Sequence, residues 1–125
     1  MFQSNLPLNC PPTDAHEDEK WLYRILKSTS VCEEEFENYV TIYSHKVEYK
    51  KMCGAYAISL YELKEKAIEN AKKNPVIGTY ITKILIKPQY GKLHCGNTKT
   101  GHYNLWLYTT FDASKVEHEL IEPIV

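Results

Sequence analysis

Residues 53–75, CGAYAISLYELKEKAIENAKKNP, decide the fold because their pattern changes halfway. The first part is short, apolar and bounded by a glycine, which predicts a buried strand from about residue 55 to residue 60. Apolar side chains then recur at helical spacing, and Glu–Lys pairs four residues apart occupy the other face. This second part predicts an amphipathic helix that ends at the Asn-Pro pair. The junction between strand and helix carries Ser59 and Tyr61.

Upstream of this junction the sequence predicts another strand and another helix. The segment WLYRILK, residues 21–27, is aromatic and branched, as is typical of a strand. Arg24 would share one face of that strand with two leucines, so its guanidinium needs a partner. Ser30 and Glu33 then have the spacing of a capping box, and apolar side chains follow at helical spacing as far as Val47.

Downstream, strand-like segments dominate the chain. Their sequences are TYITKILIKP (79–88), KLHC (92–95), YNLWLYT (103–109) and HELIEPIV (118–125). The last should be an edge strand, because Pro123 cannot donate a ladder hydrogen bond. Strands late in the chain with short connections favour antiparallel or mixed pairing. We therefore expect an α+β fold: a single domain, residues 21–125, with a mixed or mostly antiparallel sheet and two main helices, preceded by an extended N-terminal arm, residues 1–20.

Composition narrows the classes of partner. A chain of 125 residues with 43% hydrophobic and 25% charged residues is typical of one soluble globular domain. The net charge is -1, from 15 basic and 16 acidic side chains, which does not indicate an extended nucleic-acid surface. Ten tyrosines favour clefts and contact surfaces. The expected partner is a small nucleotide or a protein; nucleic acid is less favoured, and the oligomeric state is left open.

The cysteines and the apolar runs indicate the compartment. The four cysteines are widely spaced, with no Cys-x-x-Cys pair, and the first residues lack the features of a secretory signal. No apolar run has the length of a membrane span. We expect a cytoplasmic protein with four reduced thiols and no membrane contact. His94 and Cys95 would point to opposite faces of a strand, so no metal site is expected.

Common catalytic motifs are absent, including phosphate-binding glycine-rich loops and the G-x-S-x-G elbow. A weaker pattern is present: a strand ending in AISLY, a helix with alanines in EKAIENAKK, and the strand YITKILIKP. From about Trp21 to Tyr108, this pattern resembles the ADP-ribosyltransferase-like superfamily, and most of all its small, divergent toxin-like members. The resemblance implies that an early strand supplies an Arg, His or Tyr to NAD, and that a middle strand supplies a Ser or Thr. A late strand or turn often supplies a catalytic Glu.

Carried onto this chain, the resemblance implies Arg24, Ser59 and His102 as catalytic residues, with His102 where a Glu would be expected. It implies Arg24, Tyr56, Ser59 and Tyr61 as contacts to NAD or a related nucleotide. NAD would be a substrate, and no cofactor would be required. The implied function is an NAD-binding domain of a toxin or defence-associated protein. Whether it is an enzyme stays open, because an imidazole cannot stabilise positive charge on the ribose as a carboxylate does.

Two other readings stay open. The first is a non-catalytic protein-interaction module of a bacterial or phage accessory system, with tyrosines and the strand around Trp106 as its contact surface. The second is a nucleic-acid binder that uses the lysines. Each site residue also has a structural interpretation: Arg24 pairs with an acidic residue, Ser59 is a small buried residue, and the tyrosines belong to the core. The nucleotide hypothesis makes one spatial prediction, that Arg24, Ser59 and His102 line one concave pocket.

Overall fold

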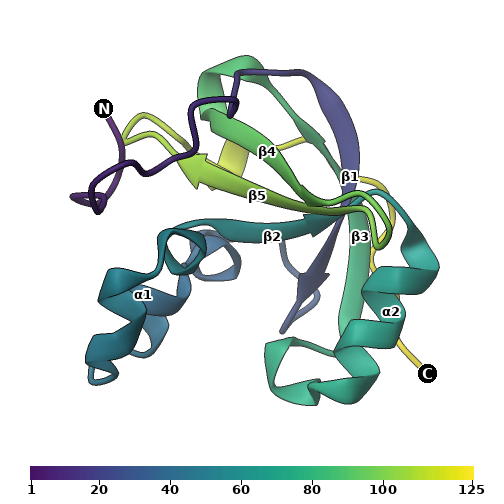
Figure 1. Ribbon diagram of the computed structural model, residues 1–125. Coiled ribbons are helices and arrows are strands. Elements are labelled where there is room, and N and C mark those ends of the chain that lie inside the picture. Colours follow the sequence, from purple (N-terminus) through teal and green to yellow (C-terminus); the bar gives the residue numbers. More distant parts are fainter.

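Six strands form the central sheet, in the order β4-β5-β2-β1-β3-β6 (Figure 1). The computed structural model describes residues 1–125. Every strand pair is antiparallel, which confirms an α+β domain with an antiparallel sheet and two helices. The strands are β1 (Lys20–Leu26), β2 (Ile58–Tyr61), β3 (Tyr80–Ile86), β4 (Gly91–Asn97), β5 (His102–Leu107) and β6 (Glu122–Pro123), and the helices are α1 (Tyr39–Ile42) and α2 (Lys64–Lys73).

The sheet opens between β1 and β2. These strands pair at one position only, Tyr23 with Tyr61, whereas β1 and β3 pair along their whole length. Beyond that pair β2 runs with β5 and β4, and β1 runs with β3, so two halves of the sheet diverge (Figure 1). The side chain of Arg24 lies in this opening.

Each side of the sheet has its own core. Leu22, Leu60 and Ile84 are fully buried in the larger cluster. On the other side, α2 packs Ala67 and Ala71 against β1, β2 and β3 in a second cluster. Small side chains at these two helix positions let α2 approach the sheet closely, and apolar burial stabilises that contact by about 25 cal/mol for each Å² removed from water.

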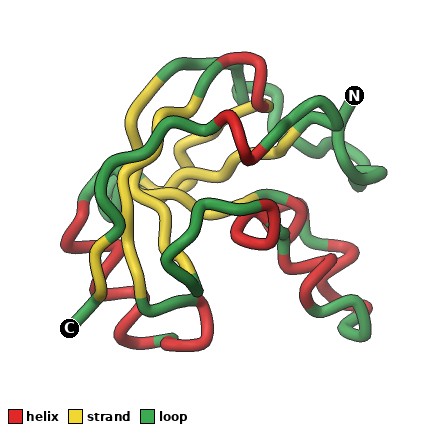
Figure 2. Tube along the Cα trace, turned by 180° about the vertical axis from the view of Figure 1, so that it is seen from behind, coloured by secondary structure: helices red, strands yellow, loops and turns green.

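The segment between β1 and β2 corrects the sequence-based prediction. A continuous helix from Ser30 to Val47 was expected, but the chain forms short helical turns, drawn in red in Figure 2, at Glu33–Phe36, Tyr39–Ile42, Val47–Lys51 and Cys53–Tyr56. Because the last of these turns occupies part of the predicted strand 55–60, β2 begins only at Ile58. We call residues 33–56 the α1 lobe.

Two side chains explain why the helix is broken. The Glu35 carboxylate accepts the backbone N–H groups of Lys27 and Ser28 at 2.9 and 2.8 Å, which binds the lobe to the end of β1. Asn38 has extended backbone angles (φ -87°, ψ 170°), and its side chain accepts the N–H of Thr41 at 2.9 Å. An N-cap in this conformation starts a new helix and therefore ends the previous turn. The predicted cap at Ser30 does not form.

The N-terminal arm lies along the β4–β5 side of the sheet. Isolated bridges join Phe2 to Tyr108 and His16 to Leu93. A disulfide joins Cys10 of the arm to Cys53 of the α1 lobe, so the prediction of four reduced thiols is wrong; Cys32 and Cys95 are free. The prediction of a cytoplasmic protein rested partly on four reduced thiols, and the disulfide removes that support, since structural disulfides are typical of oxidising compartments. None of the helices combines the length and apolar character needed to cross a membrane.

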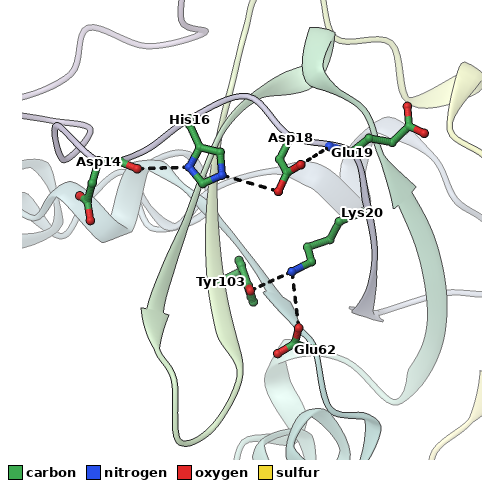
Figure 3. A network of polar contacts seen from close by, with 7 residues as sticks. All are labelled: Asp14, His16, Asp18, Glu19, Lys20, Glu62 and Tyr103. Atoms are coloured by element: carbon green, nitrogen blue, oxygen red, sulfur yellow. Dashed lines mark hydrogen bonds and ion pairs between the residues drawn. The ribbon is translucent and has the colours of Figure 1, made fainter.

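Polar contacts fix the start of β1 (Figure 3). Lys20 Nζ donates to Tyr103 Oη at 3.0 Å and lies 3.4 Å from the Glu62 carboxylate. The hydrogen bond to Tyr103 is the main reason why the pKa of Lys20 is raised. Next to it, the His16 ring lies between the Asp14 carbonyl oxygen and the Asp18 carboxylate. The two contacts of Lys20 connect β1 to β5 and to Glu62, the residue that follows β2, which are the strands that carry the site.

Candidate functional site

The largest cavity lies between the α1 lobe and α2, over β1, β2 and β5. Its volume is about 630 Å³, within the range of about 300–1,000 Å³ typical of small-molecule sites. The α1 lobe and α2 project from the same side of the sheet and form its two walls (Figures 1 and 2). The sheet supplies a polar floor of Arg24, Ser59, His102 and Asn104.

The residues predicted from the sequence converge here with one exception. Arg24, Ser59, Tyr61 and His102 all line this cavity. They meet because β5, β2 and β1 are neighbours, and because the register sets His102 opposite Tyr61. Tyr56 is not among the lining residues: its hydroxyl donates to the Lys50 carbonyl at 3.0 Å, and its ring packs near Trp106.

Ser59 and His102 form a hydrogen-bonded pair on the cavity floor. His102 Nε2 lies 3.1 Å from Ser59 Oγ. Burial lowers the pKa of His102, so its imidazole is neutral at pH 7. In the tautomer that carries its proton on Nδ1, Nε2 can accept a hydrogen bond from the Ser59 hydroxyl. The Tyr61 ring meets the imidazole edge-on, with centroids 5.4 Å apart, and fixes its orientation. Chemically, the pair offers a proton acceptor beside a hydroxyl.

The lowered pKa predicts a pH dependence. As pH falls below the ordinary value of 6.5, the unfolded chain protonates His102 while the folded protein resists it. This contribution to the free energy of unfolding is complete above that pH and is lost on acidification. Denaturation from pH 7 to pH 5 should therefore show a smaller loss of stability in His102→Gln than in the unmodified protein. An NMR titration in which the ring resonance assigned to His102 gives a pKa at or above 6.5 would contradict the prediction.

Arg24 binds backbone carbonyls. Its Nη1 donates to the Ser59 carbonyl at 2.8 Å, and its Nε and Nη2 donate to the Glu35 carbonyl at 3.2 and 2.6 Å. Burial lowers the pKa of the guanidinium and the nearby Glu35 charge opposes the shift, yet arginine stays protonated. The guanidinium thus takes the place of ladder hydrogen bonds where β1 and β2 separate. It holds the backbone of Ser59, and only its remaining N–H groups are free for a ligand.

Sequence reasoning did not find the walls of the cavity. Tyr39, Tyr49 and Met52 come from the α1 lobe, and Lys66, Asn70 and Lys73 come from α2. The lobe residues could not be found, because a continuous helix was expected there. Asn104 could have been found: it lies two residues after His102 in β5, and strand alternation places both side chains on one face.

The polar residues of the α2 wall are partly committed to one another. The Glu69 carboxylate lies 3.6 Å from Lys66 Nζ and 3.8 Å from Lys73 Nζ. Asn70 donates to the Tyr61 hydroxyl, which links the helix to the cavity floor. Exposed ion pairs of this kind contribute little to stability, so both ammonium groups can turn towards an anion in the cavity.

No group of three or more His, Cys, Asp or Glu side chains is placed to hold a metal ion. No family model matches the chain, and no curated protein or solved structure matches it significantly.

Proposed function

We propose that this protein is an ADP-ribosyltransferase-like domain that binds NAD or a related nucleotide in the cavity between the α1 lobe and α2. One observation carries the proposal: Arg24, Ser59 and His102, from an early, a middle and a late strand, line the same cavity. That convergence is what the sequence resemblance implied. The fold alone would not support a function, because one fold hosts many activities.

The chemistry of the cavity fits a nucleotide. The Ser59–His102 pair on the floor can hydrogen-bond to ribose hydroxyls, and the adjacent Tyr61 ring offers an apolar edge. Lys66 and Lys73 on the α2 wall can hold the phosphates as point charges. Arg24 acts on the backbone of Ser59 and positions it.

The same geometry defines the chemistry that would follow binding. His102 lies where the resemblance implied a carboxylate, and a neutral imidazole does not stabilise positive charge on the ribose. Its role would be to accept the proton of an acceptor hydroxyl whose oxygen bonds to the ribose carbon as the bond to nicotinamide breaks and neutral nicotinamide leaves. The protein-interaction module stays a prediction beside this proposal, as do the toxin or defence association and the location.

Calorimetric titration with NAD tests the proposal. We expect a dissociation constant that rises about tenfold in His102→Ala and in Ser59→Ala, because each change removes a hydrogen-bonding group worth about 1.4 kcal/mol from the floor. The matched control is His118→Ala, since His118 is exposed and lies outside the cavity; this variant should bind NAD like the unmodified protein. If NAD gives no heat and no thermal shift at millimolar concentration, the proposal is wrong.

A further inference from the structure

Three tyrosines on the α1 lobe have no role in folding the core. The ring centroids of Tyr39, Tyr43 and Tyr49 form a triangle with sides of 5.8, 6.0 and 5.8 Å. None of these residues belongs to the three hydrophobic clusters that stabilise the sheet and the arm. Aromatic side chains that gather on a projecting lobe and do not pack in a hydrophobic core are typical of a contact surface.

The tyrosine triangle lies in the second, basic part of the α1 lobe, whose first part carries four glutamates between residues 33 and 37. Between Tyr39 and Met52 the chain carries three lysines and one glutamate, a local charge of +2 in a protein with a net charge of -1. Lys46 Nζ lies 5.1 Å from the Tyr43 ring centroid and 5.7 Å from that of Tyr49. Lys50 and Lys51, which directly follow Tyr49 in the sequence, are exposed. One ammonium group therefore lies against the aromatic rings, and two more follow in the chain.

The surface is continuous with the cavity. Two members of the triangle, Tyr39 and Tyr49, also line the cavity. Met52, which is 52% exposed, lines the same wall. Glu34 and Glu37 line a smaller pocket together with Tyr39 and Tyr43, so carboxylates border the triangle on one side. Because Tyr39 and Tyr49 belong to both, a ligand bound at the triangle would lie next to the cavity that contains the Ser59–His102 pair.

We infer that the α1 lobe binds single-stranded nucleic acid, with unpaired bases stacked on Tyr39, Tyr43 and Tyr49 and phosphates held by Lys46, Lys50 and Lys51. Lysines alone would accept any polyanion, and tyrosines alone would accept any flat apolar group. Their combination selects a strand with exposed bases, because a duplex hides the faces of its bases in the stack. The total charge does not argue against this, since association depends on the local field.

The stacking is tested by fluorescence anisotropy with labelled DNA and RNA oligonucleotides of about 12 nucleotides. Replacing the three tyrosines by leucine should weaken binding at least about tenfold, the equivalent of about 1.4 kcal/mol. Replacing them by phenylalanine keeps the ring faces and should retain the affinity. Thermal denaturation of each variant checks that the lobe is folded. Equal affinities of the two variants, or equal affinity for a duplex of the same length, would overturn the inference.

The electrostatic part has its own test. In Lys46→Ala/Lys50→Ala/Lys51→Ala, the slope of log K against log salt should become less steep by about 2, at about 0.7 per phosphate lost. The matched control, Lys87→Ala/Lys92→Ala/Lys115→Ala, removes the same charge away from the cavity and should keep the slope. The inference is wrong if there is no binding at low salt, or if polyglutamate competes as well as the oligonucleotide. Calorimetry with NAD is a separate measurement, and its failure would leave this inference standing.

Discussion

Replacing Cys10 and Cys53 by serine is expected to lower the free energy of unfolding by about 4 kcal/mol, because their disulfide closes a loop with a sequence separation of 43. Closing a loop of this length removes much of the conformational freedom of the unfolded chain. Urea denaturation of the oxidised protein and of the double variant measures the difference. The matched control is Cys32→Ser/Cys95→Ser, since these two thiols are free, and we expect a change of less than about 1 kcal/mol.

The same substitution should also weaken ligand binding, for a local reason. Cys53 directly precedes Gly54 and Ala55, which line the cavity, and its carbonyl accepts the Trp106 indole N–H at 3.0 Å. Without the disulfide, the arm no longer holds this end of the α1 lobe.

A thiol assay should find two free cysteines in the unfolded, unreduced protein; four would contradict the disulfide.

Arg24→Met is expected to lower the free energy of unfolding by about 3 kcal/mol. The substitution leaves the Ser59 and Glu35 carbonyls without their donor at the place where β1 and β2 have separated. Each buried acceptor that loses its partner costs about 1–3 kcal/mol. The free energy of unfolding of Arg24→Lys should lie between those of the unmodified protein and Arg24→Met, because one ammonium group cannot reproduce the planar fork of donors of a guanidinium. Chemical denaturation provides the measurement, with Lys27→Met at the exposed neighbouring position as the control.

This experiment also separates two roles for Arg24. If the guanidinium positions the backbone of Ser59, stability and NAD affinity should fall together in Arg24→Met, and amide exchange in β2 should accelerate. A variant that loses NAD affinity but keeps its full stability would instead indicate a direct phosphate contact. A change in the free energy of unfolding below about 1 kcal/mol would contradict the role of Arg24 in holding the Ser59 and Glu35 carbonyls.

Local patterns were sufficient for most of the elements. The alternating and branched segments predicted β1, β3 and β5, and the helical spacing of Ala67 and Ala71 predicted α2, because these patterns reflect which side chains each element buries. The edge position of Pro123 follows from its missing N–H group, and it is found on the edge strand β6. In each case the determining interaction lies within a few residues.

The prediction failed where distant contacts outweighed a local pattern. The stretch from Ser30 to Val47 has helical spacing, but the Glu35 carboxylate binds the end of β1 and Asn38 starts a new turn. The prediction of four reduced cysteines failed for a similar reason. The Cα atoms of Cys10 and Cys53 lie 5.5 Å apart, as a disulfide requires, and no local sequence pattern shows that these two distant residues are so close.

The sequence by itself determined that a guanidinium lies on β1 and a hydroxyl on β2. It placed the His102 imidazole just before the predicted strand 103–109, whereas β5 begins at His102 itself. Only the tertiary structure decided that these groups share one cavity, because strand order and the pairing of Tyr61 with His102 depend on contacts between distant segments. It also decided that the guanidinium binds carbonyls, since the opening between β1 and β2 leaves those acceptors unpaired. The convergence of Arg24, Ser59 and His102 on one cavity is therefore a property of the sheet.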